Sequence, residues 1–397
     1  AAPGERVDAI VHRGMLTCRR RRTKTRSRPA SPPGAGVWER RIGPLAMIRA
    51  MSMPLFFRPG LAAVALIVAG MHGPDAVAGG DWRTGEFSFR RIGVAEGLAP
   101  DVLTTVYRDR AGLLWVGTRE GLYRYDGRSV LRFVRDADDP GSISDNSIRT
   151  LFQDRRGRLW IGTNTGGLSR LDPGARRFLR LRSDSAREDT LSHDSVYAIA
   201  EDATGTLWVG TQVGLNRIDP ESGAVERVPF DPGHPQGAGR EYVTVLMVDW
   251  EDALWVGTVG RGLFRRAAGE SAFTRIDPAD GLTDPSIFSL MADAGGNIWA
   301  GGPGDVFVRP RGERAFRAVG LSEVATGSID AITAIIETQE GRVLAGSYAV
   351  GIFEIDPKNF AARLHGTRPG QPGSLDDSRI TGLVIDQEQT IVGTGAM

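Results

Sequence analysis

Cysteine and lysine are almost absent from this chain of 397 residues, which has one cysteine, Cys18, and two lysines, Lys24 and Lys358. A single cysteine excludes an internal disulfide and a metal site built from several thiolates. Long apolar runs are also missing. The longest, residues 61–69, is shorter than the roughly 20 residues that a membrane-spanning helix needs.

Positive charge is concentrated at the N-terminus. Residues 1–50 hold 12 basic and 3 acidic residues, a net charge of +9 against +1 for the whole chain, so residues 51–397 carry −8. Residues 51–397 are therefore acidic overall and lack the positive charge of a nucleic-acid-binding surface. Residues 1–46 are rich in Arg, Pro and Gly without hydrophobic periodicity, which predicts a disordered basic tail or an over-extended gene start. A basic arm that binds nucleic acid or lipid headgroups is the alternative.

Residues 47–78 have the features of a secretory signal peptide. Basic residues lie near its start, residues 61–69 are apolar, and Ala76-Val77-Ala78 places small side chains where a signal peptidase reads them. We therefore expect cleavage after Ala78, with Ala76 and Ala78 as the recognised residues and a mature chain outside the cytoplasm. An uncleaved signal anchor is the alternative.

One pentapeptide recurs through the rest of the chain. It first appears as Leu114-Trp115-Val116-Gly117-Thr118, and its glycine returns at intervals of 44 to 48 residues. The further copies, of which the last three are weaker, are residues 159–163, 207–211, 254–258, 298–302, 343–347 and 390–394. A period of about 40–50 residues with a strand-like signature is typical of a propeller or a repeat array.

The third repeat illustrates the parts of a unit. Apolar segments at 196–200, 207–211, 215–218 and 224–228 are separated by short turns rich in Gly and Asp. Four short strands joined by tight turns form one blade of a propeller. The sequence therefore predicts an all-β fold, a seven-bladed β-propeller of four-stranded antiparallel blades over residues 79–397.

The first strand of each repeat has a fixed pattern relative to the turn residue that follows it, Asp109 in the first repeat. The positions six and three before the turn are apolar in all seven repeats, and the position four before it is small or β-branched. This pattern favours the innermost strand of each blade, although a spacing of three alone is typical of helix. The recurring tryptophans are predicted to lie in the core between blades.

The two ends of the repeat region predict how the ring closes. Residues 87–92 match the segment before the fifth repeat, so we expect an outer strand that completes the last blade. The seventh repeat reaches Met397 just after its second strand. We therefore expect an incomplete last blade with a vacant third-strand position and an open edge, and further sequence downstream.

These residues resemble the two-component regulator propeller repeat. The stretch from Leu114 to Asp126 reads L-W-V-G-T-R-E-G-L-Y-R-Y-D, close to the family pattern, and repeats one to four match it at most positions. The resemblance implies a periplasmic sensor domain of an inner-membrane receptor, whose output module is a histidine kinase, hybrid kinase or diguanylate cyclase. It also implies an extracellular ligand such as an oligosaccharide, a downstream signalling domain as partner, and a dimer in the full receptor.

No catalytic machinery is predicted within these residues. There is no kinase ATP-binding box, and His193, His234 and His365 lack the spacing of a metal site. No metal and no cofactor are expected. Two alternatives stay open, namely a secreted β-propeller that serves as an interaction scaffold and a carbohydrate-active propeller enzyme.

Candidate ligand-binding residues come from two positions of each repeat. One lies eight residues before the turn, at the start of the innermost strand, and the other lies in the loop between the second and third strands. Both belong to the same end of a propeller, where polar side chains can converge on a ligand. Capping of nearby backbone N–H groups is the alternative role. The predicted residues are Asp101, Arg119, Asn146, Asn164, Asp194, Gln212, Glu241, Arg261, Asp330 and Tyr348.

The signal peptide yields the first testable prediction. N-terminal sequencing of the protein isolated from the cell envelope should read from Gly79, because the Ala76-Val77-Ala78 site precedes it. A mature protein that keeps residues 61–68 would contradict cleavage and favour the signal anchor.

Overall fold

The computed structural model describes residues 65–70, 88–92, 102–231, 241–325, 327–368, 374–375, 377–386 and 389–394. The chain divides into two compact units, Ala1–Phe57 and Arg58–Met397, and the described strands all belong to the second unit. Apart from two short 3-10 turns, η3 (Pro278–Asp280) and η4 (Leu321–Glu323), the described elements are strands, which confirms the all-β prediction. None of the described residues form a helix with the length and hydropathy needed to cross a membrane.

Six blades are each formed by one repeat. Their strands, in chain order, are β3 (Leu103–Arg108), β4 (Leu114–Thr118), β5 (Leu122–Tyr125), β6 (Val130–Phe133); β7 (Ile148–Gln153), β8 (Leu159–Thr163), β9 (Leu168–Leu171), β10 (Phe178–Leu181); β11 (Val196–Glu201), β12 (Leu207–Thr211), β13 (Gly214–Ile218), β14 (Val225–Val228); β15 (Val243–Val248), β16 (Leu254–Thr258), β17 (Leu263–Arg266), β18 (Thr274–Arg275); β19 (Ser289–Ala292), β20 (Ile298–Gly301), β21 (Val306–Arg309), β22 (Arg317–Ala318); and β23 (Ile332–Glu337), β24 (Val343–Ser347), β25 (Gly351–Ile355), β26 (Ala362–His365).

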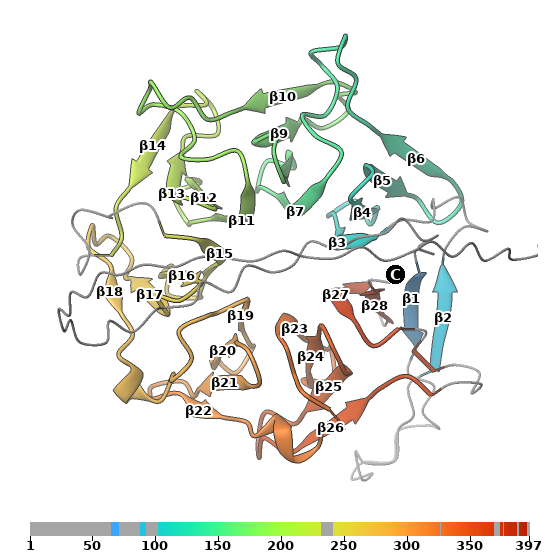
Figure 1. Cartoon of the computed structure of the whole chain (residues 1–397), viewed down its shortest axis with the longest axis vertical. Coiled ribbons are helices and arrows are strands. Elements are labelled where there is room, and N and C mark those ends of the chain that lie inside the picture. Colours follow the sequence, from blue (N-terminus) through green and yellow to red (C-terminus); the bar gives the residue numbers. More distant parts are fainter. Residues whose placement is uncertain are drawn as a thin grey trace, which may run out of the picture. The chain divides into compact units, whose positions relative to one another are not determined.

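Each blade is an antiparallel sheet whose strands pair in chain order. Figure 1 shows the first strands of the blades, β3, β7, β11, β15, β19 and β23, on the inside of the ring, and the fourth strands on its outside. The molecule is therefore a β-propeller with four-stranded antiparallel blades, as the repeat predicted, and the first strands are the innermost.

A seventh sheet combines both ends of the second unit. Its order is β2-β1-β28-β27, where β1 is Ala65–Gly70, β2 is Ser88–Ile92, β27 is Ile380–Asp386 and β28 is Gln389–Thr394. The outer position of β2 confirms the closing strand predicted at residues 87–92. The prediction of a vacant third-strand position is wrong, because β1 pairs with β28 from Ala65↔Thr394 to Gly70↔Gln389 and so covers that edge.

Strand β1 also lies within residues 47–78, the predicted signal peptide. A mature chain that begins at Gly79 would lack this strand, so N-terminal sequencing also decides whether β1 is present in the exported protein. The other parts of the predicted tail and signal peptide, including Ala76 and Ala78, lie outside the described residues. The domain boundaries therefore stay predictions.

A β-bulge explains the spacing of three on the innermost strands. In the first blade Leu103 pairs with Thr118 and Thr105 with Gly117, which leaves Thr104 as the extra residue. Because a bulge opposes two residues to one, Leu103 and Val106 can both face the core despite their odd spacing. The same shift recurs in β7, β11, β15, β23 and β27.

The turn aspartate and the tryptophan six residues later form the core contact of a blade. In the third blade Asp202 Oδ2 accepts the Trp208 indole N–H at 2.8 Å, while Oδ1 accepts the backbone N–H groups of Thr204 and Thr206. Burial opposes the charge of Asp202, but these hydrogen bonds outweigh burial and lower its pKa. The same indole bond occurs in the first, second, fourth and fifth blades at 2.7–2.9 Å. The predicted core position of the tryptophans is confirmed.

The glycine of the pentapeptide sets how closely adjacent blades approach. A Cβ placed on Gly210 would lie 2.4 Å from Val243 Cγ1, the first residue of the next innermost strand. Only a residue without a side chain fits there. Likewise, a Cβ on Gly393 of the seventh sheet would lie 2.6 Å from Leu103 Cδ2 of the first blade, so β28 packs closely against β3.

The aspartate–tryptophan contact predicts a stability difference between two blades. Replacing Asp202 with Ala removes four hydrogen bonds to its carboxylate and should lower the free energy of unfolding by about 4 kcal/mol. The four lost donors are the Thr204 N–H and hydroxyl, the Thr206 N–H and the Trp208 indole. The matched control is Thr338→Ala, because the sixth blade has Leu344 where the first five have tryptophan, and Thr338 Oγ1 accepts the Arg342 N–H at 3.2 Å. We expect a loss of about 1 kcal/mol there. Equal losses in chemical denaturation would contradict this role of the aspartate.

Candidate ligand-binding face

The two ends of the propeller differ in the loops that they carry. At one end, here called the upper face, the innermost strands begin and the second strands pass into the third, as the pairing of Val196 with Thr211 shows. At the other end, the lower face, lie the aspartate turns and the turns between the third and fourth strands. The nine predicted ligand-binding residues that the structure describes belong to loops or strand starts of the upper face.

Four of the predicted residues are engaged with neighbouring segments. Asn146 Oδ1 accepts the Arg135 N–H at 2.6 Å, and Asn164 Oδ1 accepts the Arg149 Nε–H at 2.8 Å. Asp194 accepts the Ser183 N–H at 2.7 Å and pairs with Arg182 at 2.7 Å, and Arg261 donates to Asp231 through Nε at 3.0 Å. The carboxylate of Asp194 thus holds the segment between β10 and β11, which favours the capping role for this residue.

The other predicted residues differ in exposure. Glu241 is buried, whereas Arg119, Gln212, Asp330 and Tyr348 are exposed. The predicted Asp101 lies outside the described residues. Two predicted residues are brought together through Ser195, whose hydroxyl donates to the Asn164 carbonyl and whose own carbonyl accepts the Gln212 N–H at 3.0 Å.

Three upper-face residues that the sequence did not single out form a continuous cluster with Asn164. Arg149 is the second residue of β7, and its guanidinium lies 4.3 Å from the ring centre of Tyr197, the second residue of β11. The Tyr197 ring in turn lies 4.5 Å from that of Tyr242, which precedes β15. This group, here called the Arg149 cluster, therefore joins the second, third and fourth blades.

Electrostatics within the cluster favour the neutral form of Tyr242. Burial and a side-chain hydrogen bond with Tyr197 raise the pKa of Tyr242, while the charge of Arg149 opposes this rise. Tyr242 therefore keeps its proton in any physiological buffer. The cluster presents one cation, one amide and two phenol groups, a set that can bind hydroxyl groups and an anion and that offers no general base.

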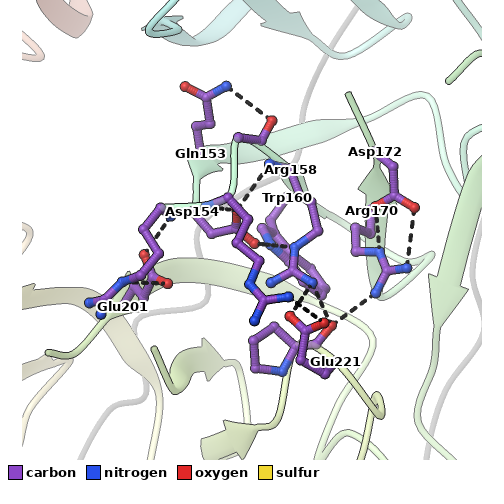
Figure 2. Close-up of polar contacts among 12 residues, drawn as sticks. Gln153, Asp154, Arg158, Trp160, Arg170, Asp172, Glu201 and Glu221 are labelled. Carbon is purple, nitrogen blue, oxygen red and sulfur yellow. Dashed lines mark hydrogen bonds and ion pairs between the residues drawn. The ribbon is translucent and has the colours of Figure 1, made fainter. Parts of the chain in front are cut away.

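The lower face carries a cavity of about 540 Å³ between the second and third blades, lined by Arg155, Arg156, Arg158, Glu201, Thr204, Gly205, Thr206, Arg217, Asp219, Pro220, Glu221, Ala224, Val225 and Glu226. Figure 2 shows Arg158 between Asp154 and Glu221. Its Nε lies 2.6 Å from Asp154 and its Nη1 2.7 Å from Glu221.

The charges around this cavity are paired with one another. Arg155 pairs with Glu201 at 3.1 Å, and Arg156 with Glu221 at 2.8 Å. Burial opposes the charge of Arg158, but its hydrogen bonds to Asp154 and Glu221 outweigh burial and raise its pKa. These contacts connect the second blade to the third. The charged groups around the cavity therefore have a structural role and are less suited to bind a ligand.

The histidines described by the structure also have structural roles. His193 Nδ1 accepts the Ser195 N–H at 2.9 Å, and His365 Nε2 lies 2.9 Å from Glu354 in a buried pair. Over the described ranges, no three His, Cys, Asp or Glu side chains gather as a metal site.

The fold and its aspartate–tryptophan repeat place the chain among β-propellers built from short sequence repeats. The sequence model described as "Two component regulator propeller" matches residues 142–165 and 190–212, in the second and third repeats. Two of the repeats are therefore recognised as two-component regulator propeller repeats. No curated protein matches it.

Solved structures share the architecture. The extracellular domain of the putative hybrid two component system BT3049 from B. thetaiotaomicron aligns with a TM-score of 0.66 and 18% identity, over 78% of this chain and 41% of that one. That of BT4673 from the same organism aligns with a TM-score of 0.60 and 21% identity, over 75% and 37%. The chain thus spans about two fifths of these domains.

An enzyme shares the fold as well. A catalytically inactive variant of virginiamycin B lyase from Staphylococcus aureus, solved with quinupristin, aligns with a TM-score of 0.54 and 12% identity, over 74% of this chain and 95% of that one. At such low identity each of these likenesses shows the fold alone.

The contacts of Asp194 predict a structural effect. Replacing Asp194 with Ala should lower the free energy of unfolding by about 1–2 kcal/mol, because the Ser183 N–H and Arg182 lose their acceptor. Gln212→Ala, at an exposed predicted position, should change stability by less than about 0.5 kcal/mol. Urea denaturation of both variants checks this. An unchanged midpoint for Asp194→Ala would remove the capping role.

Proposed function

We propose that the chain is an extracytoplasmic ligand-sensing propeller domain of a signalling receptor, either a two-component receptor or one with a diguanylate cyclase output, and that it is itself non-catalytic. The observation that carries this proposal is the match of two repeats to the two-component regulator propeller family. The likeness to extracellular domains of hybrid two component systems supports it. It also supports an exported, periplasmic location.

The proposal includes a closed ring of seven blades, with the seventh sheet as the last blade. The close packing of Gly393 against Leu103 supports this, since it repeats the contact that Gly210 makes with Val243 within the ring. A closed ring holds loops from several blades around one upper face. Such a face is suited to a ligand that bridges blades, and a signal would pass to a downstream domain and a dimeric receptor.

The ligand is proposed to be an oligosaccharide that binds at the upper face. Exposed polar side chains gather there from successive blades, whereas the charges around the lower-face cavity are paired with one another. A secreted interaction scaffold is the competing function, and it requires no small ligand at this face. A carbohydrate-active enzyme would convert the oligosaccharide rather than return it unchanged.

Ligand-dependent thermal unfolding tests the proposal. A panel of neutral and acidic oligosaccharides should include one that stabilises the protein by about 2.7 kcal/mol at a hundred times its Kd, which raises Tm by several degrees. Chromatography of the recovered ligand should show no conversion. A panel without any stabilising member favours the scaffold, and product formation favours the enzyme.

A further inference from the structure

The bulged residue of the innermost strand normally ties adjacent blades together. Thr104 donates its hydroxyl to the Ile148 carbonyl of the next blade at 2.7 Å, and Thr333 donates to the Ile380 carbonyl at 2.6 Å. Thr244 makes the equivalent bond to Ile287. At this position the repeat therefore favours a short hydroxyl side chain that stabilises the ring.

The second, third and fifth blades depart from this pattern with Arg149, Tyr197 and Phe288, and the second and third blades are adjacent. Arg149 and Tyr197 occupy the bulged position there, and the Arg149 guanidinium reaches the Tyr197 ring of the next blade instead of a backbone carbonyl, the acceptor of the threonine hydroxyl. Bulges commonly re-aim a side chain beside a functional site. Arg149 and Tyr197 still link adjacent blades, but they replace a neutral hydroxyl with a stacked cation at the upper face. The threonine of the other blades does not supply such a cation.

The charge of Arg149 is not neutralised within the part of the chain that the structure describes. Its contacts are the Asn164 amide oxygen and the Tyr197 ring, and no described carboxylate lies within 4.0 Å of it. Three other upper-face arginines are each paired with an aspartate: Arg182 with Asp194, Arg261 with Asp231, and Arg379 with Asp377. Arg149 thus differs from them in presenting an uncompensated cation.

The guanidinium is held in place by its surroundings. Asn164, which accepts from it, is fixed by its own N–H bond to the Ser147 carbonyl at 2.9 Å. The next residue, Thr165, donates its N–H and its hydroxyl to Asp145 at 2.8 and 2.7 Å. The stack on Tyr197 restrains the guanidinium plane, so little conformational entropy is lost when an anion binds.

We infer that Arg149, Asn164, Tyr197 and Tyr242 form a binding site for a sugar that bears a carboxylate, with Arg149 pairing with that carboxylate. One uncompensated cation matches a monoanion, and a planar guanidinium suits the two oxygens of a carboxylate. The amide of Asn164 and the phenol groups can bind sugar hydroxyls. The inference rests on the proposed sensing function and narrows its ligand to acidic oligosaccharides.

The test replaces the unusual residues of the second and third blades with the residue found at the same position in other blades. The double substitution Arg149→Thr with Tyr197→Thr restores the residue that the first, fourth and sixth blades carry. The probes are a trimer of galacturonic acid, a neutral trimer of galactose and sodium sulfate, each measured by titration calorimetry. The matched control is Arg217→Thr, which removes an exposed arginine of β13 that lies outside the cluster.

We expect the parent protein to bind the acidic trimer at least ten times more tightly than the neutral trimer or sulfate. The double variant should lose at least tenfold in affinity for the acidic trimer while its Tm stays equal or rises, because the introduced hydroxyls can restore the ties between blades. Arg149→Lys should lose part of this affinity, because lysine keeps the charge without the planar fork. Arg217→Thr should bind like the parent.

Each contrary outcome has a separate meaning. Equal binding of the acidic trimer by the parent and the double variant would overturn the assignment of the site. Binding of the neutral trimer alone would overturn the acidic ligand and leave the proposed sensing function standing. Preference for sulfate would replace the sugar carboxylate with a simple anion and so overturn the inference. Binding of no probe would count against the site and, together with a silent ligand panel, against sensing as well.

Discussion

A buried hydrogen bond between an aspartate carboxylate and a tryptophan indole is the contact on which a blade depends. An aspartate without partners would be costly in this interior, and the turn supplies two backbone N–H groups while the tryptophan supplies a further donor. The same tryptophan fills the space between sheets, so a single pair joins turn geometry to core packing. The sixth blade, which has Thr338 and Leu344 instead, relies on apolar packing of its second and third strands.

The blades could be predicted from the sequence because this contact leaves a periodic trace. The aspartate, the tryptophan and the close-packed glycine return at fixed offsets, and each has a physical reason to be invariant. The bulge could not be predicted in this way, because an apolar spacing of three residues is equally typical of a helix. It becomes visible only in the strand pairing, where Leu103 lies opposite Thr118. The position of β1 was also hidden, because an apolar run beside an A-x-A site has the composition of a signal peptide.

The candidate residues that the structure describes share one face, as the repeat predicted, while their role in binding a ligand stays a prediction. Sequence reasoning selected polar residues at strand starts, and Asp194 and Asn146 accept backbone N–H groups there, as caps do. The sequence did not indicate the Arg149 cluster, because its members come from strand starts and a loop of three blades, so no local pattern unites them. Asn164 alone was named in advance, since it lies in a loop between second and third strands.

In a repeat protein, the residues at one backbone position can be compared between blades. This comparison shows that Arg149 and Tyr197 are unusual. An unusual residue in a single-copy fold can be explained by its particular surroundings, whereas here the same backbone position carries threonine with a defined interblade bond in the first, fourth and sixth blades. Cavity size would have directed attention to the lower face, but the charges there neutralise one another across the junction of two blades. An uncompensated cation, held rigidly beside neutral hydrogen-bonding groups, is better suited to recognise a ligand than a larger cavity whose charges are already paired.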